Sequence, residues 1–409
     1  MDLDPEKHGK RRKTTTEDDG QQRPTAMETL PNEIIVDVLS RLPITSLVQF
    51  KFVCKRWRAL AQDPVLADMH LSLKSHGNDP CLVLHCDFPI RNQLYFLDLS
   101  AYSRDEDKAK RLFVPFQATM PEFDVVGSCN GLLCLSDSLY NDALYVHNPF
   151  TMDYIELPKS RQYPDQELVF GFGFHPKTNE YKVVKIVYYR NTSTYSYSRA
   201  RRTFYSQSDV QIFTLGSSSW RNLGKVSYQF VRQPSEALVN GRLHWVSRPR
   251  RYHPARRIVS FDLADEQFRE VPKPDCGGLN KCNFHLSVLR GCLAVAVYGN
   301  YGKLEIWIMK CYNDKESWVK EFTIGAYTPK CLKLNFDRDR PLKIWKNNGS
   351  NGKAVRVLCS LENGEVLLEY KNRVLVSYDP KKGKFRELVV QGIPNWFQTV
   401  VHTGSLNWL

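Results

Sequence analysis

Residues 125–135 read Val-Val-Gly-Ser-Cys-Asn-Gly-Leu-Leu-Cys-Leu, which places an Asn-Gly pair between two short apolar runs. Both residues of this pair tolerate a positive φ, so Asn-Gly is a strong local signal for a tight β-hairpin turn. The stretch therefore predicts an antiparallel hairpin. Four further hairpins of this kind are expected at 169–186 across Lys177-Thr178-Asn179, 237–246 across Asn240-Gly241, 286–297 across Arg290-Gly291 and 355–368 across Asn363-Gly364.

Each of these hairpins is followed by a second one, made of an apolar strand, a polar turn, an aromatic residue and a closing aliphatic residue. The copies lie at 144–157, 210–223, 258–271, 304–322 and 374–388. Two consecutive hairpins make a four-stranded unit, and repetition of such units is typical of a β-propeller.

Strand-like segments at 82–116 and 396–408 remain outside the five repeats. Together they can form a sixth blade, which closes the ring with strands from both ends and removes the exposed sheet edges. We therefore predict an all-β, propeller-like domain of six blades over residues 80–409. The stretch 326–353 fits none of these blades.

Residues 27–71 have a different pattern, in which large apolar residues recur at helical spacing. Pro31 suits the first turn of a helix, and Pro43 ends that helix and opens the next. Further short helices are expected around 47–53 and 54–61, with one more turn after Asp63-Pro64. The apolar residues that share a face of the first helix are Leu30, Ile34, Ile35, Val38, Leu39 and Leu42.

Residues 1–26 contain six Lys or Arg and six Asp or Glu, and almost nothing that could be buried. This composition predicts a disordered tail. Its Lys10-Arg11-Arg12-Lys13 cluster is either a nuclear import signal or a solvated charge run. The sequence shows no secretory signal and no apolar run of about 20 residues, so we expect an intracellular protein, nuclear or cytoplasmic, with no membrane partner. The eleven cysteines are then reduced.

Three blocks of the helical region occur in a specific order: Leu30-Pro31-Asn32-Glu33-Ile34-Ile35, Leu39-Ser40-Arg41-Leu42-Pro43 and Phe52-Val53-Cys54-Lys55-Arg56-Trp57. This region resembles an F-box. Downstream, Val169-Phe170-Gly171-Phe172-Gly173-Phe174, Tyr181-Lys182-Val183-Val184 and Asn148-Pro149 before Leu157-Pro158 resemble the F-box-associated, kelch-like domain of a large plant family. That second resemblance covers roughly residues 90–390.

The resemblance implies a substrate receptor of a ubiquitin ligase that has no catalytic residues, metal or cofactor of its own. The F-box would bind a Skp-type adaptor and through it a cullin, and the β domain would bind an unidentified target protein. The positions that match the family's adaptor-binding or helix-packing residues are Leu30, Pro31, Ile34, Ile35, Leu39, Leu42, Pro43, Val53 and Trp57. About 40 residues rarely form a stable domain alone, so these helices need either a partner or the propeller of the same chain.

Motifs that suggest catalysis or metal binding have simpler explanations. Gly127-Ser128-Cys129-Asn130-Gly131 resembles a nucleophile elbow, but it lies between two strands and no base or acid is recognisable nearby. The cysteine pairs 81/86, 129/134 and 276/282 lack the spacing of common zinc sites. His147, His175 and His244 are isolated, and we expect structural roles for them.

Two basic loops carry much of the net charge of +13. The first contains Arg201 and Arg202, and the second runs from Arg250 to Arg257. Each joins the second strand of a predicted blade to the third, so both emerge on one face of the ring. They are either solvated loops or a patch that binds an acidic or phosphorylated target. The candidate substrate-binding residues are Arg201, Arg202, Arg250, Arg251, Tyr252, Arg256 and Arg257. A propeller that binds nucleic acid through these loops is the alternative function, and an enzyme built on a propeller is a third possibility.

Overall fold

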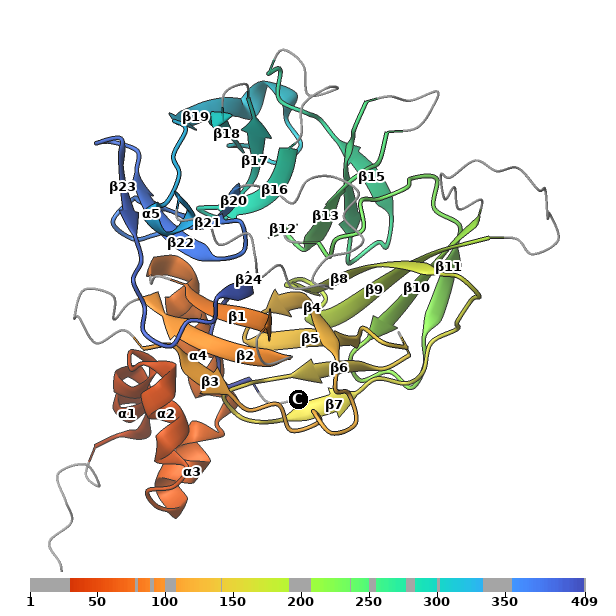
Figure 1. The fold of residues 1–409 in the computed structure, drawn as a ribbon. Helices are drawn as coiled ribbons and strands as arrows, with labels where there is room; N and C mark the ends of the chain where they lie inside the picture. Colours follow the sequence, from red (N-terminus) through yellow and green to blue (C-terminus); the bar gives the residue numbers. More distant parts are fainter. Residues whose placement is uncertain are drawn as a thin grey trace, which may run out of the picture.

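The computed structural model describes residues 30–77, 80–88, 92–99, 108–140, 142–190, 207–235, 237–249, 255–276, 284–299, 302–333 and 355–407. A helical module is followed by a ring of β-sheets (Figure 1). No helix in these ranges is long and apolar enough to span a membrane. The helices are α1 (Asn32–Ser40), α2 (Ile44–Phe50), α3 (Lys55–Ala61), α4 (Pro64–Gly77) and α5 (Lys330–Lys333).

The described strands form six antiparallel sheets of four strands each, which confirms the predicted propeller. In chain order, the first three complete sheets are β4 (Phe123–Cys129), β5 (Leu132–Asp137), β6 (Leu144–His147) and β7 (Tyr154–Glu156); β8 (Glu167–His175), β9 (Glu180–Tyr189), β10 (Gln207–Thr214) and β11 (Arg221–Gly224); and β12 (Ala237–Val239), β13 (Arg242–Val246), β14 (Ile258–Asp262) and β15 (Phe268–Val271). The next two are β16 (Phe284–Leu289), β17 (Cys292–Tyr298), β18 (Leu304–Met309) and β19 (Trp318–Ile324); and β20 (Val355–Ser360), β21 (Val366–Tyr370), β22 (Val374–Asp379) and β23 (Lys384–Glu387).

The sixth sheet combines the two ends of the propeller, as predicted. Its order is β24-β1-β2-β3, with β1 (Cys81–Phe88), β2 (Gln93–Asp98), β3 (Lys110–Leu112) and β24 (Trp396–His402). Strands β1 and β24 pair antiparallel, from Cys81 opposite His402 to Phe88 opposite Trp396. The last strand therefore closes the ring against the first.

The tight turns follow the predicted chemistry. Asn130 and Gly131 have φ values of 47° and 84°, and Asn240 and Gly241 have values of 51° and 70°. Two successive positive φ angles are the geometry of a type I′ turn, whose twist matches that of the strands it joins. The Asn-Gly pairs therefore fix the hairpin positions and the strand register.

The apolar cores lie mainly between blades. In the described part of the chain, six clusters of buried residues each combine side chains from two neighbouring sheets. Gly171 in β8 shows how close this packing is, because a Cβ atom there would lie 2.6 Å from Cζ2 of Trp245. A larger residue would push the third blade away from the second.

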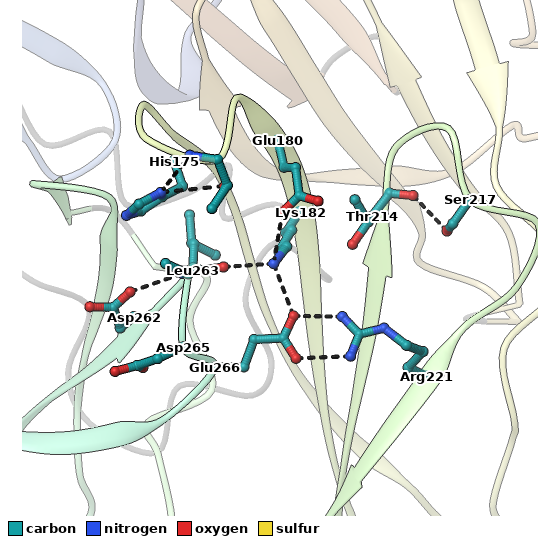
Figure 2. Close-up of polar contacts among 12 residues, drawn as sticks. His175, Glu180, Lys182, Thr214, Ser217, Arg221, Asp262, Leu263, Asp265 and Glu266 are labelled. Atoms are coloured by element: carbon teal, nitrogen blue, oxygen red, sulfur yellow. Dashed lines mark hydrogen bonds and ion pairs between the residues drawn. The ribbon is translucent and has the colours of Figure 1, made fainter.

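A polar network also joins the second and third blades (Figure 2). Lys182 in β9 donates to the Leu263 carbonyl at 2.7 Å and lies 2.9 Å from Oε1 of Glu266. Arg221 in β11 donates to the other oxygen of Glu266 at 2.9 Å. Glu180 is the second carboxylate partner of Lys182, at 3.1 Å. A buried lysine requires such partners, so this network holds the turn between β14 and β15 against β9.

The helix boundaries follow the prolines, as expected. Pro31 and Pro43 occupy the positions just before α1 and α2, and their carbonyls accept the first helical hydrogen bonds. Helix α4 is longer than the single turn that the sequence predicted, and it spans Pro64–Gly77. The reason is tertiary packing, since α4 lies along α1 and buries Leu66 and His70.

The helical module packs on the propeller. Its buried residues form one cluster with Phe96, Phe150 and Leu406 of the ring. The contact is close at Gly404, where a Cβ atom would lie 2.8 Å from Cγ2 of Ile44. One side of the module is thus covered by its own chain, which was the alternative that the sequence left open.

The two faces of the ring can be assigned from the strand order. Each sheet has four strands, so the chain returns after every blade to the face from which it started, and the inner strands β4, β8, β12, β16, β20 and β24 all run the same way. We call the face where they begin the start face and the opposite one the end face. Cys81 pairs with His402, so α4, which precedes β1, meets the ring at the end face.

Candidate functional site

Helix α1 has apolar side chains on two adjacent sides, about 100° apart around its axis. Ile35 and Leu39 point into the cluster shared with the propeller and are buried. Ile34 and Val38 each precede one of these buried residues by one position, so they lie on the adjacent side, where they are about half exposed. Large apolar side chains that stay half exposed at the edge of a buried stripe are typical of a surface that a partner covers, so the outer pair indicates such a surface.

Further apolar side chains extend this outer surface. Leu30 precedes α1 and is exposed, while Phe52 and Val53 in the turn between α2 and α3 are 75% and 64% exposed. A hydrogen bond of 3.3 Å from Arg56 to Asn32 ties the start of α3 to the start of α1. We call Leu30, Ile34, Val38, Phe52 and Val53 the outer apolar surface. It lies on the block of α1–α3 that projects from the ring (Figure 1).

The predicted adaptor-binding or packing residues thus divide between two roles. Leu30, Pro31, Ile34, Pro43 and Val53 are exposed, whereas Ile35 and Leu39 are buried. Leu42 and Trp57 are partly buried in the cluster shared with the propeller. The Trp57 ring lies 4.7 Å from that of Phe50, which fixes α3 against α2.

Val38 and Phe52 belong to the outer apolar surface but were not among the predicted site residues. Val38 follows Ile34 by one helical turn, and this spacing could have identified it. Phe52 lies in a turn, where no periodicity indicates which side a residue faces.

The two basic loops are only partly described. Arg201, Arg202, Arg250, Arg251 and Tyr252 lie outside the described residues. Both loops begin where a second strand ends, and Tyr188 of β9 pairs with Glu167 at the start of β8. Strands β9 and β13, which precede the two loops, therefore end at the start face, opposite the helical module.

The described arginines next to these loops are partly neutralised. Arg257 pairs with Glu270, which also accepts a hydrogen bond from Tyr228, and Arg248 pairs with Glu167. Burial lowers the pKa of Arg256. An arginine that already has a carboxylate partner attracts a phosphate less strongly, so the described part of these loops favours neither nucleic acid nor a phosphorylated target.

Ser128 of the elbow-like motif has a histidine partner that the sequence did not reveal. Its Oγ lies 2.9 Å from Nδ1 of His402, which is 274 positions further along the chain. Burial lowers the pKa of His402 to about 3. Such an imidazole is a weak base at neutral pH, and Ser128 sits in a strand rather than a strand-to-helix turn. The pair is better suited to holding β24 against β4 than to catalysis.

The other predicted structural residues have local partners. His244 contacts the Ala237 carbonyl and the Tyr312 hydroxyl, and His147 contacts the Asp153 carbonyl. The cysteines in the described ranges are free thiols. Within those ranges no three His, Cys, Asp or Glu side chains are grouped as metal ligands would be.

Comparison with known families identifies both parts of the chain. Residues 27–68 match the F-box-like family, and residues 84–406 match the F-box associated beta propeller domain. The chain belongs to the F-box proteins with an F-box associated β-propeller domain. Proteins that combine these two domains are typically substrate receptors of SCF ubiquitin ligases, named for their Skp, cullin and F-box components.

Relatives from Arabidopsis thaliana share the whole arrangement. The chain is 59% identical to the F-box protein At3g07870, over 98% of this chain and 97% of that one. It is 28% identical to the F-box protein CPR1, over 93% and 89% of the two chains, and 27% identical to the F-box/kelch-repeat protein At3g23880, over 89% and 91%. The F-box and propeller of this chain are therefore parts of one shared architecture.

Proposed function

We propose that this F-box protein is the non-catalytic substrate receptor of an SCF-type ubiquitin ligase. Its outer apolar surface binds a Skp-type adaptor, which links it to a cullin, and its propeller binds the target protein. The observation that carries the adaptor half of the proposal is the exposure of five large apolar side chains on a module whose other side is already buried. The family membership supports both halves.

The arrangement of the two parts suits this role. The helical module meets the ring at the end face, so it does not cover the start face, which is where we propose that the target binds. A receptor of this kind increases the rate of target modification by proximity, because it holds the target near the conjugating enzyme at a high effective concentration. No acid, base or nucleophile on the receptor is needed for that effect.

Binding of the intact chain to a purified Skp-type adaptor tests the proposal. Ile34→Ala should remove about half of the apolar area that the isoleucine side chain buries against the adaptor. That loss corresponds to about 1–2 kcal/mol of binding free energy, so binding should weaken roughly 5- to 30-fold. Val53→Glu places a charge in the apolar interface and should abolish binding. The triple variant Leu30→Ala, Pro31→Ala, Ile34→Ala should also lose it.

The matched control is Val389→Glu, which places the same charge on a highly exposed valine of the propeller. It should bind the adaptor as the unchanged chain does. The adaptor proposal fails if the folded, unchanged chain does not bind, or if Val53→Glu binds as tightly as Val389→Glu.

A further inference from the structure

The turn between β21 and β22 places two cationic residues on the start face. It consists of Lys371, Asn372 and Arg373, and the backbone N–H of Arg373 donates to the Tyr370 carbonyl at 3.0 Å. Tyr370 at the end of β21 pairs with Val355 at the beginning of the inner strand β20, so the turn lies at the start face. The helical module meets the ring at the opposite face and does not cover this turn.

Arg373 lies over the ring of Trp396, the first residue of β24. Its guanidinium carbon Cζ is 4.6 Å from the ring centroid, which is a cation–π contact. The Phe397 backbone N–H donates to the Asn372 carbonyl at 2.9 Å and so fixes the turn against β24. Arg373 and Trp396 are both partly exposed. The contact therefore holds a planar guanidinium in one orientation at the surface.

The side-chain donors of Trp396 and Arg373 have no hydrogen-bond partner in the part of the chain that the structure describes. The indole N–H of Trp318, by contrast, donates to the Pro272 carbonyl at 2.8 Å. The unpaired nitrogens of Trp396 and Arg373 are not buried, so a partner can reach them. Lys371 is exposed, and no described carboxylate pairs with it or with Arg373. These donors favour a ligand rich in acceptor oxygens.

The backbone of Lys371 gives independent support for a role of its side chain. Its φ is 49° and that of Asn372 is 58°, so the turn resembles the type I′ turns at the Asn-Gly pairs. Glycine and asparagine adopt positive φ readily, whereas a lysine there costs conformational free energy. Residues held in such conformations cluster at functional sites, so we expect the lysine to contribute more than a turn.

The carboxylate near this turn is engaged by other donors. Burial raises the pKa of the Cys331 thiol and Glu387 raises it further, whereas Arg373 lowers it, so these three groups lie near one another. Glu387 accepts from the Tyr327 hydroxyl at 2.8 Å and from the Lys330 backbone N–H at 2.7 Å. It does not pair with Arg373, whose charge thus remains available.

We propose that Lys371, Arg373 and Trp396 form a contact point for an acidic segment of the target protein. This rests on the proposed function, in which the target binds the start face. A carboxylate of the target accepts hydrogen bonds from the guanidinium, and Lys371 attracts the neighbouring negative charge. Because the Trp396 ring already orients the guanidinium, little conformational entropy is lost on binding. Tryptophan and arginine are also enriched among the residues that dominate protein interfaces.

The test follows binding of a fluorescein-labelled hexaglutamate peptide to the intact chain by fluorescence anisotropy. Arg373→Ala should weaken binding by about tenfold or more, because it removes charge-assisted hydrogen bonds. Arg373→Lys keeps the charge but loses the planar fork, so it should weaken binding about threefold. Trp396→Leu removes the ring that orients the guanidinium and should weaken binding by a similar factor.

Lys371→Asn and Lys381→Ala form a matched pair within one blade. Lys371→Asn removes the charge but tolerates the positive φ, so it should weaken binding about twofold with an unchanged urea midpoint. Lys381 is exposed in the turn between β22 and β23, which lies at the end face, so Lys381→Ala should bind the peptide as the unchanged chain does. A hexaglutamine peptide should not bind either chain, because it lacks the charge.

The proposal is overturned if hexaglutamate does not bind the folded chain, or if Arg373→Ala binds it as tightly as Lys381→Ala does. It is also overturned if a single-stranded oligothymidylate of equal charge binds more tightly than the peptide and loses binding in Arg373→Ala, which would assign this surface to nucleic acid. Adaptor binding is measured separately, and Arg373→Ala should retain it. Failure of the adaptor test alone would refute the ligase function and leave the acidic-peptide surface standing.

Discussion

Replacing Glu266 with alanine should destabilise the junction between the second and third blades. Glu266 accepts hydrogen bonds from Lys182 and Arg221, and Arg221 contributes most to lowering the pKa of this carboxyl. Removing one member of a buried ion pair costs about 3–5 kcal/mol, since it leaves the other charge buried without a partner. The 5% exposure of the Lys182 side chain places this pair in that category.

Two features reduce the expected cost. Lys182 keeps its contacts with the Leu263 carbonyl and with Glu180. Arg221 is 54% exposed and can be hydrated. We therefore expect a loss of about 2–3 kcal/mol in the free energy of unfolding. With an m-value of about 3 kcal/mol/M, the urea midpoint followed by tryptophan fluorescence should fall by about 0.7–1 M.

The control is Asp265→Ala, one residue earlier. Asp265 pairs with Arg269, and both side chains are about half exposed, so its removal should cost less than 1 kcal/mol. The double variant Lys182→Met, Glu266→Leu removes both charges of the buried pair and should recover most of the lost stability. If Glu266→Ala costs no more than Asp265→Ala, the reasoning about the buried lysine is refuted.

The pH dependence gives a second check on the same residue. The folded state lowers the pKa of Glu266, so its contribution to stability is present above its ordinary pKa of 4.5 and is lost as the pH falls through the folded pKa. The difference between the unchanged chain and Glu266→Gln should therefore shrink in acid. A difference that grows below pH 4.5 would contradict this assignment.

Three further predictions concern other parts of the molecule. Burial lowers the pKa of His244 to about 4, so the folded state resists protonation of this imidazole. The free energy of unfolding should therefore fall by about 2 kcal/mol as the pH drops from 7.5 to 5. His244→Gln should remove that part of the pH dependence in urea unfolding, and an unchanged slope would contradict the assignment. Gly171→Ala should lower the free energy of unfolding by about 1–3 kcal/mol, because the added methyl group clashes with Trp245. Gly325→Ala should be nearly neutral, because its added methyl group meets no atom within 4 Å. Equal urea midpoints for the two variants would count against close packing between the blades. We also propose that the basic cluster at residues 10–13, which lies outside the described residues, directs nuclear import. Replacing these four residues with alanine should lower the nuclear fraction of a fluorescent fusion protein. An unaltered distribution would indicate that the cluster is a solvated charge run.

Local chemistry made the fold predictable. Asn-Gly turns impose positive φ at fixed positions, and each predicted hairpin is present where the sequence placed it. The closing blade was predicted because two unpaired strand segments remained at opposite ends of the β region. The length of α4 was not, since it depends on packing along α1 rather than on any signal within its own sequence.

The candidate site was predictable only in part. Helical spacing placed Ile34, Ile35 and Leu39 together as apolar residues of one short helix. Spacing alone did not show that Ile35 and Leu39 belong to the buried cluster that includes Phe150 and Leu406 of the propeller while Ile34 is half exposed. That division depends on where the helices meet the ring, which is a contact between residues more than 100 positions apart.

The sequence by itself determined the class of each part: a short helical module whose apolar content exceeds its own core, and a ring of four-stranded blades closed from both ends. These features follow from residue spacing and turn chemistry, which act over a few residues. Only the tertiary structure decided which apolar residues remain exposed, that Ser128 meets His402, and that the inner strands β4, β16, β20 and β24 line one cavity. The physical reason is that ring closure brings β4, β16 and β24 together from distant parts of the chain, and no local pattern encodes the contacts among them.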